Sequence, residues 1–246
     1  MTVKQRYWLK FVLIFLTLGY MIFSVVAFSY RSDETMCSGL TVVVEDSAKL
    51  RFVSPSDVSL FLSEGDLNPL GIRYDCIDEA QVETCLESQP RIKKAECYKT
   101  PSGVFVVSVQ QREPIVRVMT NEGSYYVDLD GNLMAVSSDF SAYVPIVTGV
   151  VSKEIALNEL YQFAIYLHSN PFWKAQIEQV HFETERKVIL IPRVGNHVVE
   201  LGSLDDYEQK LKKLYSLYRN GFSKVGWNYY KKINLSYENQ AVCTKR

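Results

Sequence analysis

Residues 92–111 read Ile-Lys-Lys-Ala-Glu-Cys-Tyr-Lys-Thr-Pro-Ser-Gly-Val-Phe-Val-Val-Ser-Val-Gln-Gln, and they decide how the first half of the chain folds. The segment Thr100-Pro101-Ser102-Gly103 is rich in residues that accept turn dihedrals. On either side of it, Ile92 to Lys99 and Val104 to Gln111 have the length and the β-branched content of strands. The stretch therefore predicts a β-hairpin.

A strand and two helices precede this hairpin. A β-branched run from Leu40 to Val44 predicts the strand. The first helix begins at Ser54, a residue type that caps helix N-termini, and is followed by Pro at the first helical position. The second helix begins with a capping box at Asp78 and ends before Pro90. The predicted order of elements is β-α-α-β-β.

An uncharged segment of 20 residues, from Phe11 to Tyr30, lies near the N-terminus. A helix of that length spans about 30 Å, which is the hydrocarbon thickness of a bilayer. Lys4, Arg6 and Lys10 precede the segment, whereas Arg31 after it is followed by Asp33 and Glu34. The positive-inside rule then predicts a cytoplasmic tail at residues 1–10, a transmembrane helix at residues 11–30 and the rest of the chain outside.

Two other interpretations of this segment remain open. It could be a buried core helix, although such helices rarely lack charge on every face over this length. It could also be a cleavable signal peptide, because Val25-Val26-Ala27 offers small residues at the positions before a cleavage site. The apolar run is longer than the usual core of a signal peptide, which favours an anchor.

The composition limits the function classes. The chain has 27 Lys and Arg against 28 Asp and Glu, so its formal charge of −1 gives no basic face for nucleic acid. Removing the three basic residues of the tail leaves 24 basic against 28 acidic residues outside. The five cysteines are an odd number, so at least one is unpaired or pairs between chains. Their pairing is left open.

The second half of the chain predicts a β-rich unit with two helices. Asp130-Gly131-Asn132 is typical of a hairpin turn. One helix is expected from Lys153 to His168, ended by Asn170-Pro171, and a second after Ser203 and Asp206. Further strands are expected at Ile177 to Glu183, Lys187 to Arg193, His197 to Leu201 and Lys231 to Val242. The last of these strands alternates apolar and polar residues and is expected at a sheet edge, where unpaired backbone groups recruit another strand.

Three landmarks follow the hairpin in order: Gln111-Arg112-Glu113-Pro114-Ile115-Val116-Arg117, Tyr125-Tyr126-Val127-Asp128-Leu129-Asp130-Gly131 and Val144-Pro145-Ile146-Val147-Thr148-Gly149. Together with the β-α-α-β-β order behind one anchor, they resemble the FtsQ family of bacterial cell-division proteins, called DivIB in Gram-positive bacteria. The resemblance covers nearly the whole chain. It implies an α+β fold with an N-terminal transmembrane helix, a POTRA-like module at 38–112 and a β domain at 113–246.

The resemblance also implies a function. The chain would be a non-enzymatic scaffold in the bacterial inner membrane, without cofactors, with its C-terminal domain in the periplasm at the division site. It would recruit FtsB- and FtsL-like proteins by β-strand addition, and other division proteins through the POTRA-like module and the anchor. The matching positions of the docking strand are Leu235, Ser236, Tyr237, Glu238 and Asn239. The residues after Val242 lack the aromatic residue that some family members carry there.

Two alternative functions are kept. Asp128 and Asp130 form an Asp-x-Asp pair, which could hold a divalent metal in a membrane-anchored glycosyltransferase, although two carboxylates are few for such a site. His181, His197 and Cys97 have no identifiable catalytic partner in the sequence. A POTRA-type export chaperone would need repeated modules, and the β-α-α-β-β order occurs once.

Overall fold

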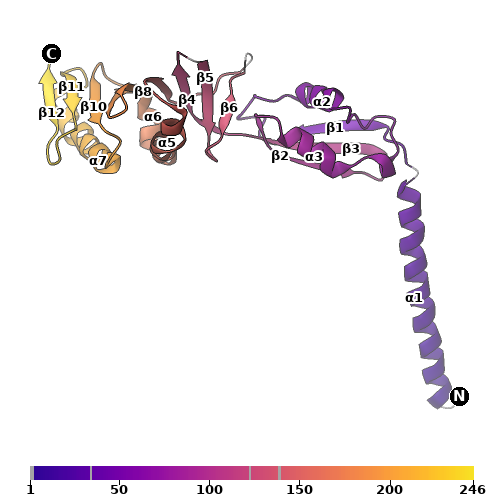
Figure 1. Cartoon of the computed structure of the whole chain (residues 1–246). Coiled ribbons are helices and arrows are strands. Elements are labelled where there is room, and N and C mark those ends of the chain that lie inside the picture. The colour runs from indigo at the N-terminus through magenta and orange to yellow at the C-terminus, as the bar shows by residue number, and fades with distance from the viewer. Residues whose placement is uncertain (1–2, 34, 122, 138–139) are drawn as a thin grey trace. The chain divides into compact units, whose positions relative to one another are not determined.

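The computed structural model describes residues 3–33, 35–121, 123–137 and 140–246, and in the first helix it describes the side chains of Trp8 and residues 12–26. The chain divides into two compact units. The first unit consists of Met1–Ser47 and Val53–Gln110, and the second of Ala48–Phe52 and Gln111–Arg246. Figure 1 shows both units along the colour ramp.

Helix α1 (Val3–Asp33) begins the first unit. Its described apolar side chains are exposed, from 41% at Val12 to 76% at Phe15. Among the residues that the structure describes, no helix combines the length and the apolar character needed to cross a membrane. Residues 1 and 2 of the expected tail, and Glu34 after the expected span, lie outside the described residues.

The rest of the first unit is a three-stranded sheet with two helices. Its strands are β1 (Gly39–Val44), β2 (Ile92–Lys99) and β3 (Val104–Gln111), in the order β1-β3-β2. β1 runs parallel to β3, with Leu40 opposite Phe105. The helices are α2 (Pro55–Glu64) and α3 (Glu79–Glu87), with a short 3-10 turn, η1 (Tyr74–Cys76), between them. The predicted β-α-α-β-β order is confirmed.

Local sequence explains where the two helices begin. The Ser54 hydroxyl accepts the N–H of Asp57, and the Asp57 carboxylate accepts the N–H of Ser54 over 2.8 Å, which completes a capping box. The Asp78 carboxylate accepts the N–H of Gln81 at the start of α3. Each helix buries one apolar stripe, formed by Val58 and Leu62 in α2 and by Val82 and Leu86 in α3.

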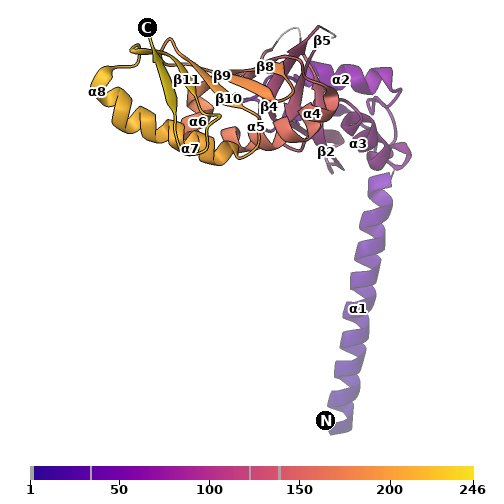
Figure 2. The same ribbon diagram turned by 60° about the vertical axis from the view of Figure 1, so that its left-hand side comes forward.

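The second unit contains a nine-stranded mixed sheet with the strand order β12-β11-β10-β9-β8-β7-β4-β5-β6. Neighbours pair in parallel at β4–β7, β7–β8 and β10–β11. Helices α5 (Glu159–Ser169), α6 (Pro171–Gln176) and α7 (Tyr207–Leu217) lie along one face of this sheet (Figure 2). The strands are β4 (Pro114–Thr120), β5 (Gly123–Asp128), β6 (Leu133–Ala135), β7 (Ile146–Gly149), β8 (Ile177–Thr184), β9 (Lys187–Pro192), β10 (Val198–Gly202), β11 (Tyr230–Asn234) and β12 (Val242–Lys245).

The two helices expected in this unit are each divided. The first is α4 (Lys153–Leu157) and α5 (Glu159–Ser169), because the Asn158 side chain donates to Glu154 O over 2.9 Å and ends the first segment. Asn170 does not only end α5; its side chain caps an unpredicted helix, α6 (Pro171–Gln176). The second consists of α7 (Tyr207–Leu217), the π-helical segment η2 (Tyr218–Phe222) and α8 (Ser223–Val225).

The expectation of one final strand from Lys231 to Val242 is wrong. The strand β11 ends at Asn234, because the Asn234 side-chain oxygen accepts the N–H of Ser236 over 2.9 Å and turns the chain. The chain returns as β12, antiparallel to β11. The edge strand therefore begins where the predicted strand ends.

Candidate functional site

Strand β12 forms one edge of the nine-stranded sheet. Its strand neighbour is β11, with Ile233 opposite Cys243. The N–H of Arg246 donates to the carbonyl oxygen of Tyr229 over 3.3 Å, toward β11. Because successive amides along a strand point to opposite sides, the N–H groups of Cys243 and Lys245 point away from β11. This outer edge can therefore accept another extended chain.

The five residues expected to bind a partner, Leu235 to Asn239, lie together in the loop between β11 and β12. Leu235 is fully buried, and its N–H donates to the carbonyl oxygen of Glu200 over 2.9 Å. Ser236, Glu238 and Asn239 are exposed, and Tyr237 is 50% exposed. The structure thus brings the five residues together beside the edge strand, but not within it.

Lys213, on α7, holds this loop in place. Its Nζ donates to the carbonyl oxygens of Leu235 at 3.4 Å and Glu238 at 3.0 Å, and also to that of Tyr237. One ammonium thereby satisfies three backbone acceptors in a loop outside the sheet ladder. The sequence did not identify this role, because a Lys toward the end of an amphipathic helix is typical of a solvated face.

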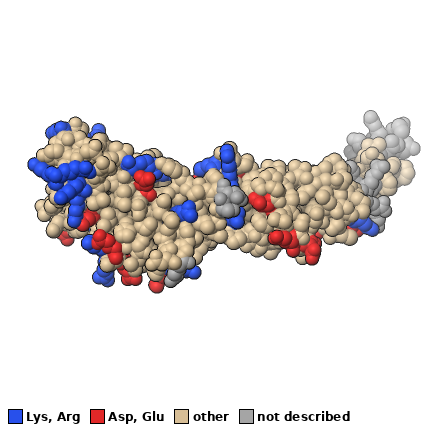
Figure 3. All heavy atoms as spheres, turned by 90° about the horizontal axis from the view of Figure 1, so that it is seen from above, with Lys and Arg blue, Asp and Glu red and all other residues tan. Residues whose placement is uncertain are grey.

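The elements around β12 are basic. From Tyr207 to Arg246 the chain has nine Lys and Arg residues against two Glu. Figure 3 shows Lys and Arg side chains gathered on the part of the second unit that carries these C-terminal elements. Such a surface favours partner segments that contain acidic residues.

A buried histidine lies at the start of β10, beside the turn to which the end of the chain binds. His197 is 2% exposed, and its Nε2 lies 2.8 Å from the hydroxyl oxygen of Tyr218. Its Nδ1 has no hydrogen-bond partner among the described residues. Burial, with a smaller contribution from the Arg246 charge, lowers the pKa of His197 to about 4. Arg246 also donates to the carbonyl oxygen of Asn196. The neutral imidazole is thus a core residue rather than a general base near neutral pH.

Asp128, the first residue of the Asp-x-Asp pair, is held within the fold by an ion pair and by backbone hydrogen bonds. Asp128 is fully buried, and its Oδ2 lies 2.9 Å from Nη1 of Arg112. Its Oδ1 accepts the N–H groups of Asp130 at 3.0 Å and Asn132 at 2.6 Å. Within the described ranges, no cluster of three His, Cys, Asp or Glu residues could hold a metal ion. The donor set therefore does not fit the divalent metal of the glycosyltransferase alternative.

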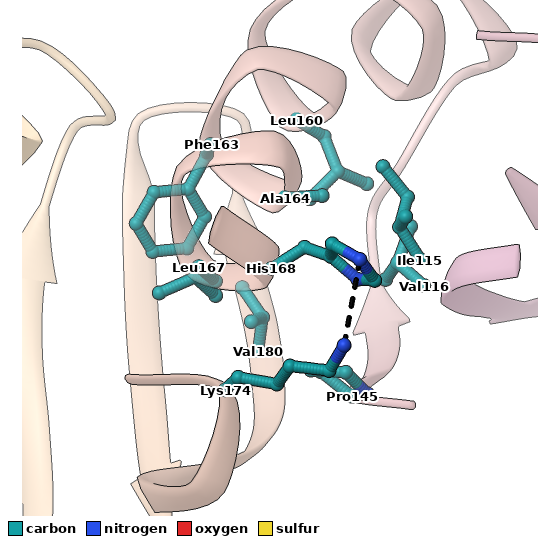
Figure 4. A pocket seen from close by; sticks show the side chains of 10 residues that line it. All are labelled: Ile115, Val116, Pro145, Leu160, Phe163, Ala164, Leu167, His168, Lys174 and Val180. Carbon is teal, nitrogen blue, oxygen red and sulfur yellow. Dashed lines mark hydrogen bonds between the residues drawn. The ribbon is translucent and has the colours of Figure 1, made fainter. Parts of the chain in front are cut away.

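A small apolar hollow lies beneath α5, with two basic side chains at its rim (Figure 4). Its volume of about 10 Å³ leaves room for about one water molecule. His168 Nε2 lies 3.4 Å from Lys174 Nζ at the rim and 3.7 Å from the Glu113 carboxylate. Burial, followed by the Lys174 charge, lowers the pKa of His168. The hollow is too small for an organic substrate.

The other candidate residues also have structural roles. The Nδ1 of His181 lies 2.9 Å from Oγ1 of Thr148, across the β7–β8 pair. Burial, with the nearby carboxylates of Glu83 and Glu79, raises the pKa of Cys97 to about 12, so its thiol stays protonated and is a poor nucleophile. All five cysteines are described, and each is a free thiol.

Models of two protein families match successive parts of the chain. A family model described as FtsQ/DivIB, C-terminal related, matches residues 113–244, which is more than half of the chain, and a POTRA-like domain model matches residues 35–110. Among solved structures, the major extracytoplasmic domain of the trans isomer of the bacterial cell division protein DivIB from Geobacillus stearothermophilus is 16% identical, with a TM-score of 0.32. The match covers 44% of this chain and 96% of that one. No curated protein matches the sequence.

Proposed function

Because the chain belongs to the FtsQ/DivIB family of bacterial cell-division proteins, we propose that it is a non-enzymatic scaffold of the division machinery. The observation that supports this function best is the open outer edge of β12, which ends a nine-stranded sheet without a second strand neighbour among the described residues.

The partners would be FtsB- and FtsL-like proteins, bound by β-strand addition to β12. On the outer edge, the N–H groups of Cys243 and Lys245 would donate to carbonyl oxygens of the partner strand. The exposed part of the neighbouring loop, Ser236 to Asn239, would contact the chain that flanks the added strand, with Tyr237 as its large half-exposed side chain. Leu235, which is buried, would contribute by holding the start of the loop in place. The basic surroundings favour an acidic partner segment.

We also propose a single membrane anchor at residues 11–30, with the N-terminus in the cytoplasm and the rest of the chain in the periplasm of a bacterium. The uncharged run from Phe11 to Tyr30 and the exposed apolar side chains from Val12 to Val26 support it. The POTRA-like module at 38–112 and the anchor would receive other division proteins, while the β domain at 113–246 holds FtsB- and FtsL-like partners.

Depletion of the protein in its own host tests this function. A division scaffold predicts undivided filaments after depletion, and a fluorescent fusion that gathers at mid-cell before constriction. Normal division after depletion, with a fusion spread evenly around the envelope, would contradict the proposal.

A further inference from the structure

The loop between α2 and η1, residues 65–73, is hydrogen-bonded to the segment that directly follows α1. The N–H of Cys37 donates to the carbonyl oxygen of Ile72 over 2.8 Å. The N–H of Tyr74, just after the loop, donates to the carbonyl oxygen of Thr35 over 3.0 Å. These bonds make the two segments a short antiparallel pair. We call residues 65–73 the tethered loop, because the chain after α1 holds them in place.

The tethered loop lies close to the end of the proposed anchor. The helix α1 continues three residues beyond Tyr30, to Asp33, and these residues add about 5 Å at 1.5 Å per residue. The two residues from Asp33 to Thr35 add at most about 7 Å. The headgroup region extends about 5 to 8 Å beyond the hydrocarbon on each side of a bilayer. The backbone of Thr35, and with it the tethered loop, therefore stays within reach of the headgroups.

Exposed apolar side chains gather at this place. Residues 35–110, all of which the structure describes, expose large apolar side chains at six positions. Three of the six, Met36, Leu70 and Ile72, lie in the tethered loop or in the segment bonded to it, and they are 52%, 49% and 38% exposed. The other three lie apart from one another, on β1, α2 and β2 (Val43, Leu60 and Tyr98). Grouped apolar side chains mark an interaction surface, whereas scattered ones are ordinary.

The charges around this surface offset one another. In the tethered loop, Nε of Arg73 donates to the carboxylate of Asp75 over 3.1 Å. In the sequence before the tether, Arg31 is followed by Asp33 and Glu34. Since two basic residues face three acidic ones, the surface has no net positive charge to attract anionic headgroups. A contact here gains its free energy from the burial of apolar side chains.

We propose that Met36, Leu70 and Ile72 insert into the interfacial region of the lipid bilayer, so that the first unit contacts the membrane at a second place beside the anchor. This inference rests on the proposed anchor at residues 11–30. The tether selects the bilayer as the occupant, because the same few residues that leave the membrane carry the loop. The contact limits the rotation of the first unit about the end of the anchor.

Photo-crosslinking of the whole chain in vesicles of phosphatidylethanolamine and phosphatidylglycerol tests the contact. A photoreactive side chain at position 70 should give a product heavier than the 28.2 kDa chain by one phospholipid. Position 43 is the matched control, because Val43 is similarly exposed at 45% but lies about 13 Å along β1 from Gly39. It should give little or no lipid adduct. Equal adducts at positions 70 and 43, or a product with a second copy in place of lipid at position 70, would overturn the proposal.

A photoreactive side chain at position 20, within the expected span, separates the loop contact from the anchor. Lipid adducts at position 20 without any at position 70 would overturn the loop contact and leave the anchor standing. No adduct at position 20 would contradict the anchor, and the loop contact with it.

A substitution tests the apolar character of the contact in the same vesicles. Met36→Asp should lower the adduct yield at position 70 at least about tenfold, because a carboxylate resists transfer out of water. Val43→Asp is its control and should leave the yield unchanged. Both variants should keep the wild-type unfolding midpoint, and an undiminished yield in a folded Met36→Asp protein would overturn the apolar contact.

Discussion

The guanidinium of Arg112 lies 2.9 Å from the buried carboxylate of Asp128. The two residues belong to different sequence landmarks, one before β4 and one at the end of β5. The carboxylate also holds the turn that follows through the N–H groups of Asp130 and Asn132. The first two of the three sequence landmarks are thus joined by one ion pair to a buried carboxylate.

Arg112→Ala should lower the free energy of unfolding of the second unit by about 3 kcal/mol, because it leaves a buried carboxylate without its cation. Urea unfolding followed by the fluorescence of the buried Trp173 measures this. Lys49→Ala, which breaks the exposed pair with Glu113, is the control and should cost less than about 1 kcal/mol. Equal costs for the two variants would show that the Arg112 pair is not a buried support.

Gly149→Ala should destabilise the second unit by more than about 2 kcal/mol, because it combines a left-handed backbone with a collision. Gly149 has a φ of +97°, and an added Cβ would lie 2.1 Å from the carbonyl oxygen of Phe182. Gly226→Ala is the matched control: its φ is +85°, but nothing lies within 4 Å of the added atom. The control should lose less stability than Gly149→Ala in the same unfolding measurement, because only the strain of its backbone, at φ 85° and ψ 159°, remains. A Gly149→Ala variant that loses no more stability than the control would contradict the close approach of β8 to Gly149.

The first unit could be predicted from sequence because short-range signals set its elements. The turn at Thr100 to Gly103 fixed the hairpin, and the caps at Ser54 and Asp78 fixed both helix starts. In the second unit the parallel pairing of β4, β7 and β8 was not predicted, because it depends on contacts between segments distant in sequence. The break between α4 and α5 was not predicted either. It depends on the hydrogen bond from the Asn158 side chain to the carbonyl oxygen of Glu154, and the pattern of apolar residues along the helix does not reveal such a bond.

The candidate site could also be predicted only in part, because the contacts that shape it do not show in the local sequence pattern. The alternation that suggested one strand after Lys231 did not reveal the turn at Asn234, so the docking residues were assigned to a strand and lie in a loop. Lys213 contacts that loop across 22 to 25 positions of sequence, and no local pattern joins the two. Whether Leu235 to Asn239 bind a partner remains a prediction.

Lys213→Met should free the loop between β11 and β12, because three carbonyl groups lose their common donor. Hydrogen exchange of the amides from Ser236 to Ala241 should become faster, while the global free energy of unfolding changes by less than about 1.5 kcal/mol. Lys212→Met, at the exposed neighbouring position, should change neither quantity. Unchanged exchange in Lys213→Met would mean that the loop is held by other contacts.

His197 should make the second unit sensitive to acid. In the folded protein its pKa is about 4, whereas in the unfolded chain it is near 6.5. The unfolded state therefore binds more protons between these values, so the stability that depends on neutral His197 is complete above about pH 6.5 and falls toward pH 4, by at most about 3 kcal/mol. The slope of unfolding free energy against pH in this window should be smaller in His197→Gln. An identical slope in both proteins would remove His197 as the cause.

Two substitutions at Lys245 test most directly whether a partner strand adds to the outer edge of β12. Lys245→Ala removes the side chain and keeps the outward N–H, whereas Lys245→Pro removes the N–H as well. Neither variant loses a hydrogen bond to β11, because this N–H points away from β11. Co-purification of FtsB- and FtsL-like proteins should persist with Lys245→Ala and be lost with Lys245→Pro, while both variants keep the wild-type unfolding midpoint. Full capture by a folded Lys245→Pro protein would contradict strand addition at β12.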